Sequence, residues 1–346
     1  MTAGVWVARV LILALAWAPA FEAVAAEPAS ATAGATLQRL EEEIARIAET
    51  VAGDVGVAAL HLESGSSAHY RADVRFPMAS VYKIPIAVQV LTRAGRGEIA
   101  LDSLLFIQPH ELRPGSGWIA DLLVAPGVGL SVENLLRLSI MVSDNTATDL
   151  LLRTAGGPGP VTARLRALGI DEMRVDRSTL QIILASDGIE GAVADDAYTE
   201  EAYMRALAAA PAETRREAAW RAFTDVRDTT TPRAMVELLR RIWAGEAVPG
   251  EGRRILLESM VESTAGRRIG GMLPPGTAGP THKSGTIWGG GLYTVNDVGF
   301  VELPGGAGHV ALALFIGRAH GEVGDLETIL AHLARTVVDG FLLSRP

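Results

Sequence analysis

A serine and a lysine three positions apart are the first residues here that could carry out covalent chemistry. They enclose the segment Ser80-Val81-Tyr82-Lys83, and helix-forming residues follow it. Residues three apart lie on one face of a helix, so the hydroxyl and the amine can meet. A nearby lysine with a lowered pKa can take the serine proton and activate the hydroxyl as a nucleophile. The backbone N–H of Ser80, at a helix start, is also free to face an oxyanion. Alone, the pair could equally be two surface residues.

Two later segments add hydroxyl, amide and amine groups. Ser143-Asp144-Asn145 follows an apolar helix and supplies a hydroxyl that could pass a proton to a leaving nitrogen, and an amide that could hold a carbonyl. Lys283-Ser284-Gly285-Thr286 lies on an expected strand, where a lysine and hydroxyls could attract a substrate carboxylate. Gly285 would let a substrate backbone approach, and the N–H of Thr286 would be a second oxyanion donor. Taken singly, the segment at 143–145 is also compatible with a helix cap. The segment at 283–286 is also compatible with an edge strand that a lysine protects from pairing with other chains.

In this chain order, the three segments resemble the class A β-lactamases and penicillin-binding proteins. The resemblance covers nearly all of the chain after its N-terminal segment, with further matching stretches at 76–80, 143–147, 227–232 and 294–297. It implies that a lactam or peptide carbonyl acylates Ser80, that Lys83 takes the serine proton, and that Ser143 relays this proton to the nitrogen. Lys283 would support the relay and the substrate carboxylate. The substrate-binding residues that it implies are Asn145, Ser284, Gly285, Thr286 and Trp118, although Trp118 could equally be an ordinary surface aromatic.

The sequence departs from the family at the residue that deacylates the enzyme. Class A members carry a glutamate that activates the hydrolytic water. Here Asp176-Arg177-Ser178-Thr179 matches the start of the corresponding Asp-Arg-x-Glu pattern but ends in Thr179, which cannot act as a base at neutral pH. The segment after Thr179 is longer than the family's loop and contains several carboxylates. Glu190, beside apolar Ile189, is the favoured replacement base, and the alternative is that all of these carboxylates are solvated surface charges.

A second departure concerns the group that binds the substrate carboxylate. We find no arginine at the family's expected strand or at the start of the last helix, and Arg318 is a possible substitute. His282 occupies a position where an acidic residue is common in the family.

Composition excludes several other functions. A formal net charge of −9 argues against nucleic acid as a partner. The chain has no cysteine, which excludes disulfides and thiolate chemistry, and its seven histidines show no metal-binding spacing, so we expect no metal and no cofactor. The expected partner is a small molecule, either a β-lactam or a peptidoglycan-like peptide, and the protein is expected to be a monomer.

The N-terminus has the order of a secretory signal peptide. Arg9 precedes a short apolar run, and small residues follow at 23–26, which predicts cleavage near Ala25 or Ala26. The apolar run is shorter than the roughly 20 residues that span a bilayer, so a membrane anchor is the weaker alternative. We therefore expect a periplasmic or secreted protein with no stable membrane anchor after cleavage.

We predict that one catalytic domain at 36–346 positions these segments. A signal peptide at 1–26 and a linker at 27–35 precede it. Strands are expected at 54–62, from 68, and at 281–287, 292–302 and 310–316. Because they come from both ends of the chain, we predict an α/β (α+β) fold, with one antiparallel sheet flanked by helices and an all-helical lobe. The sheet lobe should contain residues 36–100 and 265–346. The helical lobe should contain 101–264, with an insertion at 184–226 that includes one added helix over 199–220.

The leading hypothesis is an exported serine β-lactamase-type hydrolase that works through an acyl-enzyme on Ser80. A D-Ala-D-Ala-type peptidase or another amidase is the first alternative, since it would suit a site without the deacylating glutamate. A penicillin-binding sensor that is acylated without efficient turnover is the second. A pseudoenzyme is disfavoured because Ser80, Lys83, Ser143 and Lys283 are all present.

Overall fold

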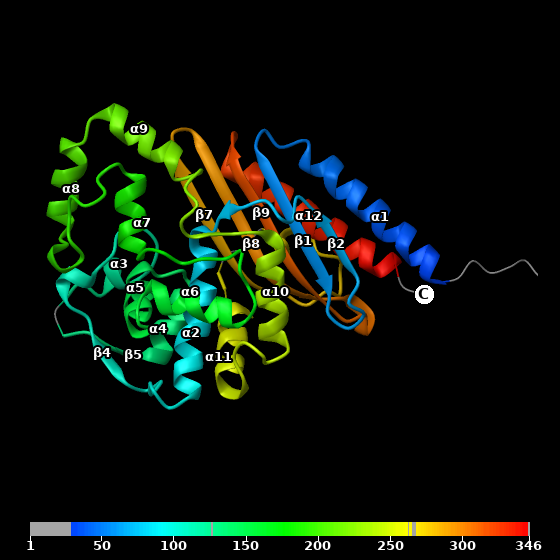
Figure 1. The fold of residues 1–346 in the computed structure, drawn as a ribbon, viewed down its shortest axis with the longest axis horizontal. Helices are drawn as coiled ribbons and strands as arrows, with labels where there is room; N and C mark the ends of the chain where they lie inside the picture. The colour runs from blue at the N-terminus through cyan, green and yellow to red at the C-terminus, as the bar shows by residue number, and fades with distance from the viewer. Residues whose placement is uncertain (1–28, 126, 262, 265–267, 345–346) are drawn as a thin grey trace, which may run out of the picture.

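A five-stranded antiparallel sheet is the centre of the molecule (Figure 1). The computed structural model describes residues 29–344 except 126, 262 and 265–267, so the predicted signal peptide lies outside the described residues. The strand order is β2-β1-β9-β8-β7. The strands are β1 (Asp54–His61), β2 (Ser67–Tyr70), β7 (Thr281–Gly289), β8 (Leu292–Glu302) and β9 (His309–Ala319). The predicted assembly of one sheet from both ends of the chain is confirmed.

Two helices from the ends of the chain cover one face of this sheet. They are α1 (Ala29–Ala48) and α12 (Val323–Leu343), and their apolar sides form a buried cluster with the strands. The helices approach so closely that a side-chain carbon placed at Gly340 would lie 2.7 Å from Leu40. Residues 29–35, predicted as a linker, lie in the first turns of α1. Alanine is abundant there, and it has the highest helix propensity of all residues.

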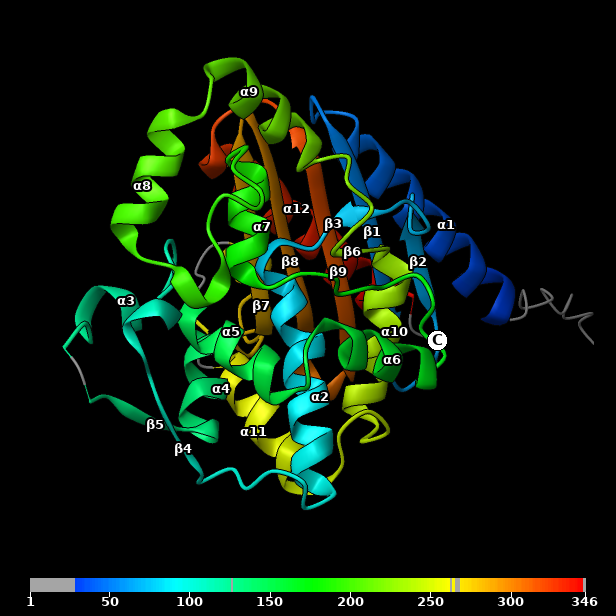
Figure 2. The same ribbon diagram turned by 60° about the vertical axis from the view of Figure 1, so that its left-hand side comes forward.

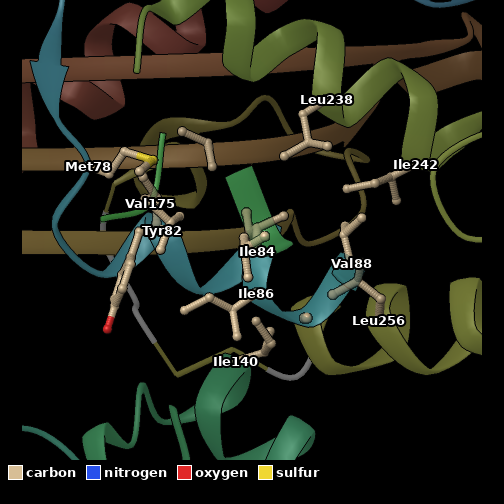
Figure 3. Close-up of a cluster of buried hydrophobic side chains, with 14 of the residues drawn as sticks. Met78, Tyr82, Ile84, Ile86, Val88, Ile140, Val175, Leu238, Ile242 and Leu256 are labelled. Carbon is tan, nitrogen blue, oxygen red and sulfur yellow. The ribbon is translucent and has the colours of Figure 1, made fainter. Parts of the chain in front are cut away.

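The opposite face is covered by α10 (Pro232–Trp243), and the helical lobe continues beyond it (Figure 2). The central helix of this lobe is α2 (Lys83–Gly95), which is buried along most of its length. Figure 3 shows its side chains Ile84, Ile86 and Val88 within the cluster that joins the two lobes. Around α2 lie α4 (Val132–Met141), α5 (Asn145–Thr154), α6 (Pro158–Ala167) and α11 (Gly250–Val261).

Three features differ from the predicted division into lobes. Helix α2 packs with the helical lobe rather than with the sheet lobe, and α10 packs on the sheet. The helical lobe is not all-helical, because it contains a short ribbon of β4 (Leu104–Phe106) and β5 (Gly129–Ser131), connected through α3 (Ile119–Leu122).

No helix within the described residues is long and apolar enough to cross a membrane.

The insertion forms a small helical unit beside the sheet. Its helices are α7 (Thr179–Ser186), α8 (Glu200–Ala209) and α9 (Ala212–Arg221). The prediction of one helix over 199–220 is wrong, because the chain breaks at Ala210 and Pro211. Proline lacks an N–H and disfavours helical backbone at the residue before it, and Ala210 accordingly has an extended ψ of 126°. The unit has its own apolar cluster, which contains Leu180, Leu184, Ile189, Val193 and Tyr198.

Candidate active site

Ser80 lies in a 3₁₀ turn, η1 (Ala79–Tyr82), directly before α2. The chain enters this turn through β3 (Phe76–Pro77), which pairs with β6 (Thr229–Thr230). From β8, Asn296 donates side-chain hydrogen bonds to the carbonyls of Pro77 (2.9 Å) and Met78 (3.1 Å). The serine therefore lies at the junction of the sheet and the helical lobe, held from both sides.

Strand β7 approaches the serine turn at Gly285, a residue that has no side chain. A carbon placed at the Cβ position of Gly285 would lie 2.8 Å from the backbone N of Ser80 and 2.9 Å from the carbonyl oxygen of Met78. Real Cβ contacts are not this short. Gly285 thus permits the close approach that brings Thr286 and Ser80 to the same cleft.

The side chains of two lysines meet at one hydroxyl. Lys83 Nζ and Lys283 Nζ each donate to Ser143 Oγ at 3.1 Å, although these residues are far apart in the sequence. Lys83 also donates to the Ser143 carbonyl (2.5 Å) and to Asn145 Oδ1 (2.8 Å). Among the described residues, Lys83 Nζ has no hydrogen bond to the Ser80 hydroxyl. The structure thus brings Lys83, Ser143 and Lys283 together as the sequence predicted, with Ser143 as the shared acceptor.

Burial changes the protonation of both lysines. Each side chain is about 1 % exposed. Loss of hydration, followed by the nearby charge of Lys283, holds the pKa of Lys83 well below its usual value. Burial, with a smaller contribution from Arg268, lowers the pKa of Lys283 to about 7, even though Asp297 opposes the shift. A neutral amine at Lys83 donates to only two of its three neighbouring acceptors, and its lone pair can accept a proton, as a base that activates a serine must.

The loop that carries Ser143 is fixed by its neighbours. Asp144 is buried and accepts backbone hydrogen bonds from Trp118 (2.7 Å), Ile119 (2.8 Å) and Ala147 (2.8 Å). Ser143 itself has a φ of 59°, and Ala79 and Asp228 nearby also have positive φ values, of 49° and 52°. Non-glycine residues in this region are strained, and such strain is concentrated at functional sites.

Asn145 lines the cleft, whereas Trp118, predicted from the sequence as a substrate-binding residue, is not among the residues that line it. The Asn145 amide donates to the Pro114 carbonyl (2.8 Å) while its oxygen faces Lys83, so its orientation is fixed. The turn at Pro114, Gly115 and Ser116 lines the cleft together with Asn145. Trp118 follows this turn and is 54 % exposed.

Thr179 lies at the first turn of α7, where its hydroxyl hydrogen-bonds to that of Tyr82. Its backbone N–H and that of Leu180 are both bound by the Asp149 carboxylate (2.6 and 3.2 Å), which also pairs with buried Arg113 (2.7 Å). Figure 3 shows the Tyr82 hydroxyl directed away from the apolar cluster. Burial and the charge of Asp149 raise the pKa of Tyr82 well above its usual value, so its phenol stays neutral. Neither hydroxyl can serve as a base.

Arg268 also reaches this site, although no sequence pattern predicts it. Its buried guanidinium donates to the carbonyls of Gly285 (2.9 Å) and Asn296 (2.8 Å) and to the Thr286 hydroxyl (2.6 Å). It lies in the connection between α11 and β7, where no periodicity or motif marks it. Arg318, the substitute considered from sequence, instead pairs with Asp54 at 2.7 Å. His282 is buried with its Nδ1 2.8 Å from the Asp297 carboxylate.

A cleft of about 970 Å³ joins Ser80 to the insertion. Glu190, the predicted replacement base, also lines it, but its carboxylate is largely exposed and pairs with Arg227 at 3.0 Å. Asp187 lines the same cleft and accepts a hydrogen bond from Tyr203 (2.7 Å), and burial raises its pKa. Among the described residues, no group of three or more histidine or acidic side chains is placed to hold a metal ion.

Comparison with known proteins gives a consistent result. Residues 39–341 match the model of the beta-lactamase enzyme family. The chain is 29 % identical over 313 residues to the carbapenem-hydrolyzing beta-lactamase KPC of Klebsiella oxytoca, covering 90 % of this chain and 91 % of that protein. A beta-lactamase from Chitinophaga pinensis superimposes with a TM-score of 0.71 at 28 % identity, covering 87 % and 98 % of the two chains. A variant of the class A beta-lactamase of the last common ancestor of Gram-negative bacteria gives 0.69 at 29 % identity, covering 88 % and 98 %.

Proposed function

The chain belongs to the beta-lactamase enzyme family, and we propose on this basis that it is an exported serine hydrolase that opens β-lactam amides through an acyl-enzyme on Ser80. The observation that carries the proposal is the meeting of Lys83 and Lys283 at the Ser143 hydroxyl, each at 3.1 Å, beside the cleft that Ser80 lines. The K. oxytoca relative, a carbapenem-hydrolyzing enzyme by name, supports a lactam as substrate.

In the proposed acylation, neutral Lys83 accepts the Ser80 proton as the hydroxyl oxygen attacks the lactam carbonyl. The backbone N–H groups of Ser80 and Thr286 stabilise the oxyanion. As the C–N bond breaks, the Ser143 hydroxyl gives its proton to the lactam nitrogen and is reprotonated by Lys83 through their existing hydrogen bond. Protonated Lys283 holds Ser143 and attracts the substrate carboxylate. Arg268 orients the Thr286 hydroxyl toward the same group.

Deacylation is the slow step in this proposal. It requires a base near the ester, and the position expected for it is occupied by Thr179 and the neutral Tyr82 phenol. The same pair favours a second candidate function, a penicillin-binding sensor that remains acylated. A D-Ala-D-Ala-type peptidase or amidase is the third, and it would also form an acyl-enzyme on Ser80 but with a peptide as its preferred substrate.

Intact-mass spectrometry separates these functions. The protein without its predicted signal peptide is mixed with excess penicillin and followed from seconds to hours, with Ser80→Ala as the control. An adduct that forms and clears while the lactam is consumed supports the hydrolase. A lasting adduct indicates the sensor. No adduct with lactam, but cleavage of an acyl-D-Ala-D-Ala peptide, indicates the peptidase.

A further inference from the structure

The cleft extends from Ser80 into the space between α7 and β7. From Thr286 to Gly289, β7 advances three residues, or about 10 Å at about 3.3 Å per residue. Along the opposite wall, α7 has eight residues and is about 12 Å long at about 1.5 Å per residue. Both walls contribute residues to the same cleft as Ser80. We call this part of the cleft, between α7 and β7, the arm. It is long enough to hold a short peptide or an acyl chain beyond Ser80.

Helix α9 closes the far end of the arm. A side-chain carbon placed at Gly289 of β7 would lie 3.0 Å from Ala219, and one placed at Gly188, after α7, would lie 3.3 Å from Ala218. The helix thus contacts the far ends of both walls, and Figures 1 and 2 show it crossing between them. Much of the lining is apolar, formed by Ile182, Ile183, Ala185, Ala218, Ala222, Ile287 and Trp288.

One cation in this arm has no partner among the residues that the structure describes. Three arginines line the cleft, and two of them are neutralised, since Arg177 pairs with Asp228 (2.7 Å) and Arg227 with Asp225 (2.7 Å). The third, Arg221 at the C-terminal end of α9, is exposed, and among the described residues its guanidinium has no ion pair or hydrogen bond.

The acidic side chains of the cleft do not neutralise Arg221. Asp225 and Asp228 are held by Arg177, and Glu190 is held by Arg227 at 3.0 Å. Asp187 is bound by the Tyr203 hydroxyl at 2.7 Å. An anionic group that entered the arm would therefore find an available guanidinium at its closed end.

The geometry points to Arg221 as a specificity residue that selects substrates whose acyl side chain is extended, apolar along its length and anionic at its end. Such a side chain could belong to a β-lactam or to a peptide, and the recognition chemistry would be the same. The inference rests on the proposed function, because it assigns the side chain of a substrate that acylates Ser80.

The test compares two penicillins with one nucleus and unbranched side chains of equal length, one ending in a carboxylate and the other in a primary amide. In the unmodified protein we expect the penicillin with the terminal carboxylate to acylate Ser80 about fivefold faster per unit concentration than the penicillin with the terminal amide. This is about 1 kcal/mol, the upper range for a solvent-accessible ion pair. Arg221→Gln should abolish the difference by slowing acylation only by the penicillin with the terminal carboxylate. Arg216→Gln, on an exposed position of the same helix outside the cleft lining, should preserve it.

Equilibrium binding of the same two penicillins to Ser80→Ala gives a readout that does not depend on acylation. A fivefold tighter binding of the carboxylate that disappears in Ser80→Ala/Arg221→Gln would support the inference, even if neither penicillin labelled Ser80 and the proposed function failed. Equal binding of both penicillins, or a preference that survives Arg221→Gln, would overturn it.

Discussion

Replacement of Thr179 by glutamate should convert a slow acyl-enzyme into one that hydrolyses. Thr179 is 6 % exposed, lines the cleft beside Ser80 and occupies the first turn of α7. A carboxylate introduced there would be the basic group that Thr179 and the neutral Tyr82 phenol do not provide. A positioned general base contributes about 10²–10⁴-fold to a rate, which is about 3–5 kcal/mol of barrier.

The surroundings of Thr179 place the expected gain of the single substitution below that range, and only a second substitution at Tyr82 should bring it to the lower end. The Tyr82 hydroxyl already fills the space beside Thr179, and forcing extra atoms into a packed site costs about 1–3 kcal/mol. We therefore expect Thr179→Glu alone to accelerate deacylation by about tenfold. With Tyr82→Phe, which removes the competing hydroxyl, the acceleration should reach about 10²-fold. The nearby Asp149 carboxylate disfavours a second negative charge and keeps the introduced group basic.

The assay isolates deacylation. Each variant is acylated with penicillin and freed of excess lactam, and the loss of the adduct is followed by intact-mass spectrometry. Thr179→Gln, in both backgrounds, has a similar size but no basic oxygen. If the glutamine variants lose the adduct as fast as the glutamate variants, or if the double variant Thr179→Glu/Tyr82→Phe deacylates no faster than the unmodified protein, the reasoning about the missing base is wrong.

Three further predictions concern groups that position the site. Gly285→Ala should slow acylation about 10²-fold, because its methyl group would displace the Ser80 backbone, and stopped-flow acylation at an unchanged rate would contradict this. Asp149→Ala leaves Arg113 buried without its ion pair and should lower the free energy of unfolding by about 3–5 kcal/mol in urea titrations; a loss below about 1 kcal/mol would mean that the pair behaves like a surface one. Acylation should fall about tenfold per pH unit above about 7, as Lys283 loses its proton, and Lys283→Arg should remove this dependence. Stability should change in the opposite direction, because the unfolded state binds the Lys283 proton more tightly and the folded state therefore gains stability from about pH 7 upward.

The sequence predicts much of this architecture because local patterns determine it. The strands of the sheet have alternating or continuous apolar runs, and Thr231 and Ser131 cap α10 and α4 as their sequences indicate. The two lysines and Ser143 could be brought together from motifs alone. Arg268 could not, because it reaches the site through hydrogen bonds to Gly285 and Thr286 that no local pattern encodes.

The insertion was the least predictable part. Its helical propensity is visible in the sequence, but the predicted single helix is interrupted at Pro211, which separates α8 from α9. The pairing of Tyr82 with Thr179 depends on how α7 docks against η1, a contact between segments 97 residues apart. The partners of Glu190 and Asp187 likewise depend on how the insertion folds back over the cleft.

The left-handed backbone at Ala79, Ser143 and Asp228 has a consequence for heat resistance. Each such residue costs about 1–3 kcal/mol, a considerable share of the about 5–15 kcal/mol that separates a folded domain from its unfolded state. Three of the five non-glycine residues with positive φ in the described part of the chain thus lie at the site, which therefore has much to gain from local relaxation. On warming, these three residues should relax before the sheet and α2 come apart, so catalytic competence should be lost several degrees below the melting of the fold.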